Sequence, residues 1–418
     1  MSVAGNQQRT LLNLLAQLSP HWRRDRSLPA RVQTLLSRNR SFGSRDRRLY
    51  RELIYTTLRF LPWVEPLLES DSDQAARIVA WLAADSPATE HFRKTLVADW
   101  PSCPPGVAEK AAVLNQQTSV TFFPGSNRSG AKFETDRLLP TWIAEQCPEA
   151  LISPEIDALH SRAPLWIRLN TAAIDQVTNE FDQLGWRWRA SSILKTALQL
   201  LDEVDVTKTA AFAAGAVEVQ DLGSQLLLES AGIEPGERWL DACAGAGGKT
   251  LQLAQILGAT GRIDAFDIRR AALMELQTRT NRAHINTVSI LENRPTGEYD
   301  GVLVDAPCSG SGTWRRAPHL KWATTFERIT EAASIQCALI EEFSRRVRVG
   351  GRLLYATCSL NRLENEAVVA DFLSTHPQFV SEHSLKDFGG IVRGGGLTVL
   401  PALHNTDGFF IAALRREA

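Results

Sequence analysis

In the second half of the chain, short apolar runs alternate with longer segments whose hydrophobic residues recur at helical spacing. The apolar runs predict β-strands at residues 238–243, 262–267, 287–292, 301–305 and 351–357. The amphipathic segments predict helices at residues 249–257, 269–282, 326–346 and 364–374. This alternation is typical of a doubly wound, mostly parallel α/β sheet with helices on both faces. Ligands of such sheets bind at the carboxyl ends of the strands.

The first 150 residues have helical spacing throughout. One helix is predicted at residues 45–61, with Ser44 as a candidate N-cap and with one face made by Leu49, Leu53, Ile54, Thr57, Leu58 and Leu61. Further helices are predicted at residues 9–18, 75–84 and 108–115, and a loop at residues 122–130.

Residues 160–220 mix the two patterns on a smaller scale. Strands are predicted at residues 164–170 and 217–220, a helix at residues 171–184, and a second helix at residues 220–229. We therefore predict three domains: an all-helical domain at residues 1–150, a small α/β subdomain at residues 160–225, and the doubly wound domain at residues 226–418.

Charge is distributed unevenly, although the formal net charge of all 418 residues is only -1. The first sixty residues hold twelve arginines, no lysine and three acidic residues, a net charge of +9. Such a basic end favours an anionic partner, and nucleic acid is the usual one. The alternative is a solvated helical surface with no partner.

Six cysteines are scattered along the chain, without a CxxC pair or a Cys/His cluster. This spacing indicates neither a zinc site nor a disulfide framework. The apolar stretch at residues 11–18 is too short to span a membrane and does not resemble a signal peptide. We expect a reducing, cytoplasmic location, where free thiols persist as reactive groups.

A glycine-rich turn at residues 241–250 follows the first strand of the doubly wound region. It fails the P-loop pattern, whose first glycine would fall on Cys243, and it fails the dinucleotide pattern, whose third glycine would fall on Thr250. An acid, Asp267, ends the next strand and could accept both hydroxyls of a ribose. Together these features predict S-adenosylmethionine as the cofactor; the alternative is a plain strand–helix turn.

Two cysteines follow the ends of two further strands, in Asp305-Ala306-Pro307-Cys308 and Thr357-Cys358-Ser359. Carbon 5 of cytosine is a poor nucleophile, but addition of a thiolate to carbon 6 turns the ring into an enamine that can accept a methyl group at carbon 5. This chemistry needs a nucleophilic thiol, an acid near ring N3, and a group that assists release. Asp305, Cys308 and Cys358 supply candidates for all three.

Burial as a small hydrophobic residue is the ordinary alternative for a free cysteine. We apply that interpretation to Cys103, Cys147 and Cys337. Cys243 is expected to pack within the glycine-rich turn, with its backbone near the cofactor.

Four motifs in this order, at residues 241–250, 305–308, 357–359 and 407–410 (Asp-Gly-Phe-Phe), resemble those of the Sun/Nop (Fmu-type) RNA cytosine-5 methyltransferases. The similarity covers residues 160–418. It extends more weakly to an N-terminal region that, in the bacterial rRNA enzymes of the family, resembles the transcription antitermination factor NusB. The resemblance implies a class I methyltransferase domain, an RRM-like subdomain and a helical RNA-binding domain.

The resemblance also implies a role for each motif residue. Cys358 would be the nucleophile, Cys308 would assist release of the product, and Asp305 would contact the cytosine near the cofactor. Asp267 would hold the ribose of S-adenosylmethionine. The methionine part would be wrapped by Cys243, Ala244, Gly245, Ala246, Gly247, Gly248 and Lys249.

This sequence departs from the family pattern at two positions. Ala246 stands where the family has a proline, and we expect a small effect on cofactor affinity. The acid of the third strand, which would contact the adenine, has Glu292 as its nearest match, followed by Asn293.

Residues 312–318 and the pair Lys321 and Trp322 follow the Pro-Cys motif and combine arginine, lysine and tryptophan. Such residues suit phosphate contacts and base stacking, but both tryptophans could equally pack under the active-site loop. Six N-terminal arginines would bind RNA backbone: Arg38, Arg40, Arg45, Arg47, Arg48 and Arg51.

We therefore predict a monomeric, S-adenosylmethionine-dependent RNA cytosine-5 methyltransferase that acts on small-subunit rRNA, without a metal or a membrane. A catalytically silent RNA-binding or ribosome-assembly factor is the alternative from another class. Transfer RNA is an alternative substrate. A DNA cytosine-5 methyltransferase would use Cys308 as nucleophile, and it would need a target-recognition insert between the motifs that this chain lacks.

Overall fold

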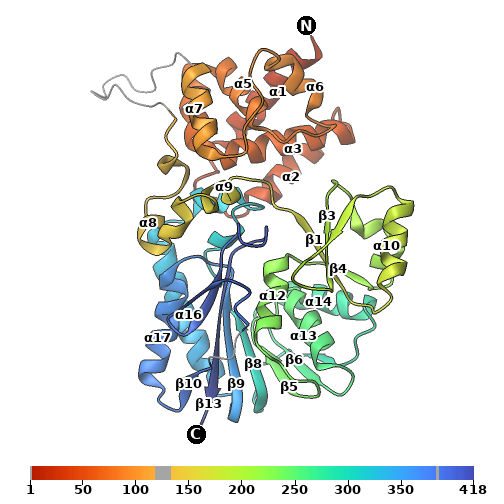
Figure 1. Cartoon of the computed structure of the whole chain (residues 1–418), viewed down its shortest axis with the longest axis vertical. Helices are drawn as coiled ribbons and strands as arrows, with labels where there is room; N and C mark the ends of the chain where they lie inside the picture. Colours follow the sequence, from red (N-terminus) through yellow and green to blue (C-terminus); the bar gives the residue numbers. More distant parts are fainter. Residues whose placement is uncertain (1, 118–132, 383–385) are drawn as a thin grey trace. The chain divides into compact units, whose positions relative to one another are not determined.

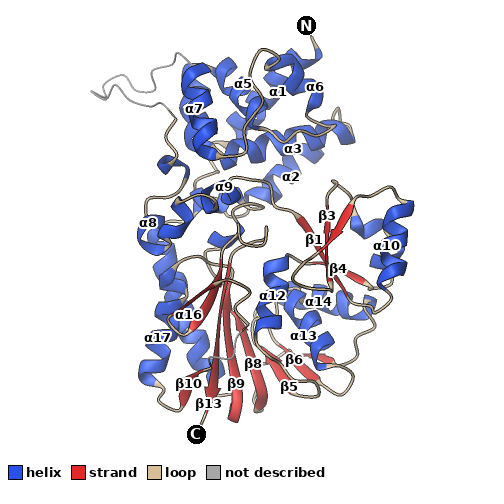
Figure 2. Cartoon of the chain, viewed as in Figure 1, coloured by secondary structure: helices blue, strands red, loops and turns tan. Residues whose placement is uncertain are grey.

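Amphipathic helices build the first of two units in the chain (Figures 1 and 2). A computed structural model describes residues 2–117, 133–382 and 386–418, so the loop predicted at residues 122–130 lies outside the described residues. The first unit comprises Met1–Arg162 and Trp314–Phe326, and the second comprises Ala163–Thr313 and Glu327–Ala418. The helices of the first unit are α1 (Val3–Leu18), α2 (Leu28–Arg38), α3 (Ser44–Arg59), α4 (Leu61–Ser70), α5 (Ser72–Leu82), α6 (Glu90–Leu96), α7 (Val107–Gln117), α8 (Ile143–Gln146), α9 (Glu155–Leu159) and α15 (Pro318–Ala323).

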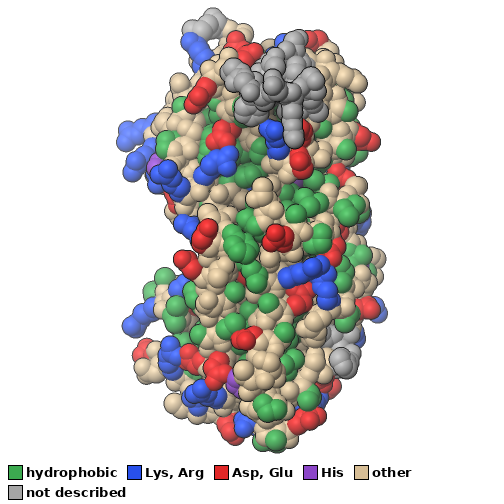
Figure 3. Space-filling view, turned by 90° about the vertical axis from the view of Figure 1, so that its left-hand side faces the viewer, with side chains coloured by type: hydrophobic (Ala, Val, Ile, Leu, Met, Phe, Trp, Pro, Cys, Tyr) green, Lys and Arg blue, Asp and Glu red, His purple; other side chains and the backbone are tan. Residues whose placement is uncertain are grey.

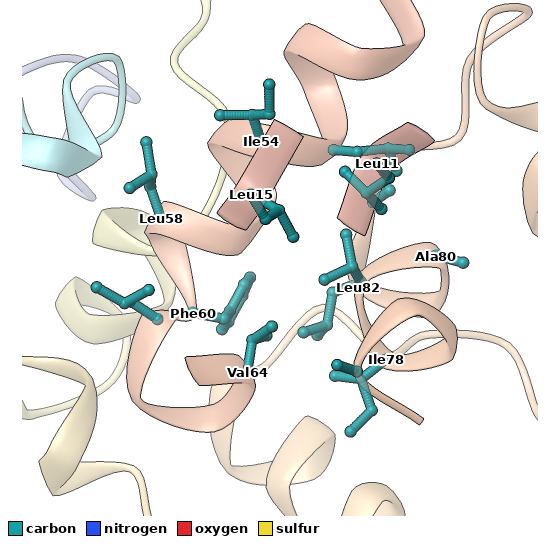
Figure 4. Close-up of a cluster of buried hydrophobic side chains, with 14 of the residues drawn as sticks. Leu11, Leu15, Ile54, Leu58, Phe60, Val64, Ile78, Ala80 and Leu82 are labelled. Atoms are coloured by element: carbon teal, nitrogen blue, oxygen red, sulfur yellow. The ribbon is translucent and has the colours of Figure 1, made fainter. Parts of the chain in front are cut away.

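The core of the helical unit is formed by the apolar faces of these helices. Figure 4 shows Leu11 and Leu15 of α1 near Ile54 and Leu58 of α3. Burial of such leucine and isoleucine side chains stabilises the unit by about 1.5–3 kcal/mol each. The predicted N-cap of α3 is wrong by one residue: Gly43 is the N-cap, and its N–H donates to the Asp46 carboxylate at 3.0 Å.

Helix α15 belongs to the helical unit although it follows the Pro-Cys motif in the sequence. The indole Nε1 of Trp322 donates to the Leu58 carbonyl at 2.6 Å, and the Lys321 Nζ donates to the Arg59 carbonyl at 2.9 Å. Trp314 is fully buried and its ring packs edge-on against Trp142. Trp314 and Lys321 are therefore buried, Trp322 is half-buried, and both tryptophans pack within the helical unit.

The second unit begins with a small antiparallel sheet of order β2-β3-β1-β4. Its strands are β1 (Leu165–Leu169), β2 (Trp188–Ala190), β3 (Ala197–Leu200) and β4 (Val217–Val219), and its helices are α10 (Ile174–Gln183) and α11 (Ala210–Ala213). Ile167 pairs with Leu198 on one side and with Val219 on the other, which places β1 inside the sheet.

A larger sheet follows, with order β11-β12-β13-β9-β8-β5-β6-β7 and β10 paired to β13. Strands β5 to β9 are parallel, and β10 to β13 add an antiparallel edge, so the predicted mostly parallel sheet is confirmed. The strands are β5 (Arg238–Asp241), β6 (Arg262–Ala265), β7 (Val288–Ile290), β8 (Tyr299–Asp305), β9 (Val347–Thr357), β10 (Phe379–Ser381), β11 (Ile391–Arg393), β12 (Gly396–Val399) and β13 (Phe409–Arg416).

Helices cover both faces of this sheet (Figure 1). They are α12 (Leu222–Ser230), α13 (Gly248–Leu257), α14 (Arg270–Arg282), α16 (Phe326–Ser344) and α17 (Glu366–Thr375). Because side chains alternate along a strand, Leu303 and Leu354 face α12 and α13, whereas Val304 and Tyr355 face α16 and α17. Burial on both faces explains why these strands are apolar runs in the sequence.

The small sheet is joined to α14 by close packing and by buried charges. A Cβ on Gly215 would lie 2.4 Å from the Ala283 Cα, so only glycine allows this approach. Glu218 of β4 forms ion pairs with Arg279 and Arg282 of α14. The small sheet and the larger sheet therefore share one unit, and the division into three domains stays a prediction. Within the described ranges, no helix has the length and apolar character needed to cross a membrane.

Candidate active site

Three neighbouring strands bring the predicted motifs to one edge of the larger sheet. In the sheet order β9-β8-β5, the carboxyl ends are Thr357, Asp305 and Asp241. Asp241 pairs with Leu303, and Asp305 pairs with Ala356, so the three ends lie at nearly the same level. The order of the strands reverses between β8 and β5, which is where ligands bind in sheets of this kind.

The glycine-rich turn connects β5 to α13 and takes a backbone path that favours glycine. Gly245 and Gly247 have φ angles of 55° and 88°. A Cβ on Gly247 would lie 2.2 Å from the Cδ1 of Leu276 on α14. Helix α13 begins at Gly248, so its N-terminus follows directly after the turn.

Asp267, the predicted ribose ligand, already accepts four hydrogen bonds. Its Oδ1 accepts from the Arg269 backbone N–H at 2.7 Å and from Nε at 2.9 Å. Its Oδ2 accepts from the Gly245 N–H at 2.8 Å and from the Arg269 guanidinium at 2.9 Å. Burial raises the pKa of Asp267, but these hydrogen bonds outweigh it and hold the pKa below its ordinary value. Because a carboxylate offers about four acceptor positions, a ribose would compete with the Arg269 side chain for Asp267.

An open pocket of about 570 Å³ adjoins Asp267. Its apolar lining includes Phe266, Ile268 and Leu273, and its polar rim includes Glu292 and Asn293. The Glu292 side chain is 82% exposed, and its Oε1 lies 3.9 Å from the Arg270 guanidinium. Glu292 therefore borders the predicted adenine site without a buried contact.

Asp241 is fully buried beneath the glycine-rich turn. Its Oδ2 accepts from the Thr250 hydroxyl at 2.7 Å, whereas its Oδ1 is buried without a hydrogen-bond partner. Burial raises the pKa of Asp241 to about 7; the Thr250 hydrogen bond opposes this shift, and the charge of Asp305 adds to it.

Lys249, in the first turn of α13, has its ammonium group against the end of β8. Its Nζ lies 2.7 Å from the Asp305 Oδ2. Burial lowers the pKa of Lys249, but the attraction and hydrogen bond of Asp305 outweigh it and raise the pKa above its ordinary value. The negative charge of a Cys358 thiolate contributes in the same direction. The side chain of Lys249 is thus directed to the motif of Asp305, although the sequence places it in the glycine-rich turn.

Cys308 and Cys358 lie side by side, with 3.4 Å between their sulfur atoms. The hydrogen bond with Cys358 raises the pKa of the Cys308 thiol well above its ordinary value, and burial raises it further. The two loops are also joined through their backbones: the Gly312 N–H donates to the Cys358 carbonyl, and the Gly408 N–H donates to the Gly312 carbonyl, each at 2.9 Å. The Asp407-Gly-Phe-Phe motif therefore supports the loop that carries Cys308.

The other four cysteines are buried or partly buried. No disulfide joins any of the six cysteines, all of which lie in the described ranges. Cys243 is partly buried in the glycine-rich turn, and burial raises the pKa of its thiol. Cys147 is buried, and Cys103 and Cys337 pack against hydrophobic clusters. In the described part of the chain, no three His, Cys, Asp or Glu side chains converge as metal ligands.

Three side chains of this site were not found from the sequence. Glu364, which accepts hydrogen bonds from both cysteine loops, is the first residue of the helix predicted at residues 364–374, but α17 begins at Glu366. Arg269 forms an ion pair with Asp267, and Arg279 donates a hydrogen bond to the Ala246 carbonyl at 2.7 Å. The contacts of Arg279 with Ala246 and of Glu364 with Ser309 join distant segments, so the sequence carries no local signal for them, whereas Arg269 lies only two residues after Asp267.

Comparison with known proteins gives a consistent result. The family described as 16S rRNA methyltransferase RsmB/F matches residues 230–415. Ribosomal RNA small subunit methyltransferase B of Vibrio vulnificus is 30% identical over 67% of both chains, and that of Yersinia pseudotuberculosis (serotype O:1b, strain IP 31758) is 28% identical over the same shares.

The fold has solved counterparts as well. The crystal structure of PH0851 superposes with a TM-score of 0.71 over 92% of this chain and 93% of that chain, at 24% sequence identity. At this identity the likeness bears on the fold alone, which is a mostly parallel α/β sheet with a helical N-terminal region. Together with the sequence relatives, it leads to one conclusion: this chain is an RNA methyltransferase of the RsmB/F (Sun) family.

Proposed function

We propose that this enzyme transfers a methyl group from S-adenosylmethionine to carbon 5 of a cytosine in small-subunit ribosomal RNA. The observation that carries the proposal is the pair of thiols, Cys308 and Cys358, whose sulfur atoms lie 3.4 Å apart. Two adjacent thiols suit a reaction in which one adds to the pyrimidine ring and the other acts on the same ring. The names of the sequence relatives support ribosomal RNA as the substrate.

The residues at the end of β5 and β6 fit the proposed cofactor. The turn at Gly245 and Gly247 lets the backbone approach a ligand closely, and the open pocket beside Asp267 has apolar walls for an adenine. The unpartnered Oδ1 of Asp241 lies beneath this turn. We assign Cys243, Ala244, Gly245, Ala246, Gly247, Gly248 and Lys249 to the methionine part, Asp267 to the ribose, and Glu292 to the rim of the adenine pocket. S-adenosylmethionine supplies an electrophilic methyl group when it is bound.

Cys358 is the nucleophile in this proposal. The hydrogen bond with Cys358 and then burial raise the pKa of Cys308, which favours a protonated Cys308 as the donor to the Cys358 sulfur. The Lys249 ammonium interacts favourably with a negative charge on Cys358. A thiolate that accepts a hydrogen bond and faces a cation is the stabilised one of the pair.

The Cys358 thiolate forms a bond to carbon 6 of the cytosine, and the ring electrons move toward N3 and carbon 5. Asp305, ion-paired with Lys249, is a carboxylate that can accept from the exocyclic amino group. A proton for ring N3 can pass from the Lys249 ammonium through Asp305 across their 2.7 Å contact. Lys249 and Asp305 thereby stabilise the ring in which carbon 5 becomes nucleophilic.

Release of the product requires that the bond between the Cys358 sulfur and carbon 6 breaks. When the Cys358 sulfur is bound to the ring, it no longer carries the negative charge that keeps Cys308 protonated. Cys308 can then lose its proton to solvent and remove the proton from carbon 5. The carbon–sulfur bond breaks, the double bond between carbons 5 and 6 forms again, and the bonding electrons return to Cys358 as a thiolate. The proton at ring N3 returns through Asp305 to Lys249, which restores the neutral ring and the ammonium.

The helical unit offers an arginine-rich surface for RNA. Arg38, Arg40, Arg45, Arg47, Arg48 and Arg51 are all exposed, and none forms an ion pair with a described residue. Lysine and arginine side chains gather at one edge of the upper, helical part in Figure 3. Such a surface binds backbone phosphates without reading the sequence. The target cytosine must be unpaired or extruded, because carbon 6 is inaccessible within a stack.

The proposal is tested with RNA from cells that lack this protein. Total RNA and isolated small subunits are incubated with the purified enzyme and labelled S-adenosylmethionine, and 5-methylcytosine is mapped by bisulfite sequencing. We expect one restored cytosine in small-subunit rRNA, and none with the Cys358→Ala variant. A restored position in transfer RNA would overturn the substrate, and no incorporation into any RNA would favour a silent RNA-binding factor.

A further inference from the structure

The carboxylate of Glu364 is fully buried between the two loops that carry Cys308 and Cys358. Its Oε1 accepts from the Ser309 backbone N–H at 2.7 Å and from the Gln336 amide at 3.3 Å. Its Oε2 accepts from the Ser309 hydroxyl at 2.5 Å, the Ser359 hydroxyl at 2.5 Å and the Asn361 amide at 2.7 Å. One side chain thus receives five hydrogen bonds from three separate segments.

The position of these donors connects Glu364 to the cysteines. Ser309 is the residue after Cys308, and Ser359 is the residue after Cys358. Gln336 of α16 additionally donates to the carbonyl of Pro307, the residue before Cys308, at 2.9 Å. A shift of either loop relative to the other would therefore break hydrogen bonds to one buried carboxylate.

A carboxylate suits the buried position of Glu364 because of the number of hydrogen bonds that it can accept there. Every described donor to Glu364 is uncharged, so the buried negative charge is stabilised by hydrogen bonds alone. Burial of a charge without a counter-ion is unfavourable, and apolar residues could fill such a site at no lower stability. A carboxylate is, however, the side chain with enough acceptor positions to receive both serine hydroxyls and a backbone N–H together.

The charge of Glu364 also acts on the pair of thiols. The pKa of Cys308 is raised by its hydrogen bond with Cys358, then by burial, then by the charge of Cys358, and further by the charge of Glu364. The same carboxylate therefore orients the Cys308 loop and favours the protonated form of its thiol.

We propose that Glu364 is a positioning residue that holds the two cysteine loops in register, so that both sulfur atoms reach the same pyrimidine ring. This inference rests on the proposed function, in which Cys358 adds to the ring and Cys308 assists release. Glu364 touches neither substrate nor cofactor, and it acts through Ser309 and Ser359. Loss of its hydrogen bonds to Ser309 and Ser359 should impair release more than attack, because the Cys308 sulfur is then no longer held against the ring, whereas Lys249 still interacts with Cys358.

The test is Glu364→Gln, with Glu366→Gln as the matched control. Glu366 lies two residues further on and pairs with Arg393 at 2.9 Å, away from both cysteine loops. We expect Glu364→Gln to lower kcat about 10- to 100-fold with little change in S-adenosylmethionine affinity, and to increase the fraction of enzyme covalently bound to RNA on denaturing gels. In a Cys308→Ala background, where release is already blocked, Glu364→Gln should have little further effect on that fraction.

Equal turnover of Glu364→Gln and Glu366→Gln would overturn the inference. So would a parallel loss of activity, cofactor affinity and melting temperature, which would indicate a merely structural role. Should Glu364→Gln fail to fold, Ser309→Ala removes one hydroxyl only and should produce a weaker increase of the same covalent fraction; an unchanged fraction would overturn the inference as well. Failure of the wild-type enzyme to form any adduct would instead overturn the proposed function itself.

Discussion

The Lys249 ammonium and the Asp305 carboxylate are 2.7 Å apart, and they connect the glycine-rich turn to the loop of Cys308. Lys249 comes from the first turn of α13 and Asp305 from the end of β8. The pair thus spans the point where the strand order of the sheet reverses. It brings a cation close to Cys358, which interacts electrostatically with Lys249.

Replacement of Lys249 by methionine should lower the methyl transfer rate about 100- to 1000-fold, the range for removal of one preorganised electrostatic partner. Without the ammonium, the Cys358 thiolate is less stable, so the acid limb of the single-turnover pH–rate profile should move to higher pH. Lys249→Arg keeps the charge and should leave that limb nearer its original position. A methionine variant with a slower rate but an unmoved acid limb would exclude the proposed effect on the thiolate.

We expect the buried carboxyl group of Asp241 to make the free energy of unfolding depend on pH. Its pKa in the folded protein is about 7, raised mainly by burial, whereas an unfolded aspartate titrates near pH 4. Between these values the folded state holds a proton that the unfolded state has lost, so this group makes the protein less stable as pH rises from about 4 to 7. Asp241→Asn should remove this contribution. The melting temperature of Asp241→Asn, relative to that of the wild type, should therefore be higher at pH 8 than at pH 5. A difference between the two proteins that is the same at both pH values would contradict the assignment.

Arg279 supports the turn at the position where the resembling family has proline. Its guanidinium donates to the Ala246 carbonyl at 2.7 Å and is held by Glu218 at 2.9 Å. Loss of one charge-assisted hydrogen bond should weaken S-adenosylmethionine binding about tenfold in Arg279→Met, measured by calorimetry. Arg282→Met is the control, because Arg282 pairs with the same glutamate without a described contact to the turn. Equal effects of both variants would indicate loss of subdomain packing instead.

The arginine-rich surface predicts a salt-dependent affinity for RNA. Joint replacement of Arg45, Arg47 and Arg48 by glutamine should weaken binding and reduce the slope of log affinity against log salt, because fewer counterions are released. The measurement is a salt titration of RNA binding with catalytically inactive Cys358→Ala protein. Joint replacement of the arginines in the small sheet, Arg187 and Arg189, provides a comparison of exposed charges elsewhere. An unchanged slope in the triple variant would rule out this surface as the phosphate contact.

The sequence allowed the sheet and its functional edge to be predicted because both rest on local patterns. Strands buried on both faces are continuous apolar runs, and each run here ends in a polar residue: Asp241, Asp305 or Thr357. Parallel strands linked by helices place their carboxyl ends together, so the motifs had to meet. The boundaries of the three predicted domains stay predictions, because the small sheet shares a unit with the larger one.

Contacts between distant segments could not be predicted in this way. From the sequence, Trp322 suits base stacking with RNA as well as packing within the protein. Its hydrogen bond to the Leu58 carbonyl, far earlier in the chain, shows that it packs within the protein. In the sequence, Glu364 is a charged residue at the start of the helix predicted at residues 364–374. Its burial depends on serines from two loops that meet only in the folded sheet.

Cys358 and Cys308 have separate roles in the proposed reaction, and covalent trapping on RNA distinguishes these roles. Single alanine variants of each are incubated with substrate RNA and labelled S-adenosylmethionine and then separated on denaturing gels. The account predicts no adduct and no methylation with Cys358→Ala, and with Cys308→Ala an adduct that carries one methyl group and persists. An adduct with Cys358→Ala and none with Cys308→Ala would contradict it and make Cys308 the nucleophile.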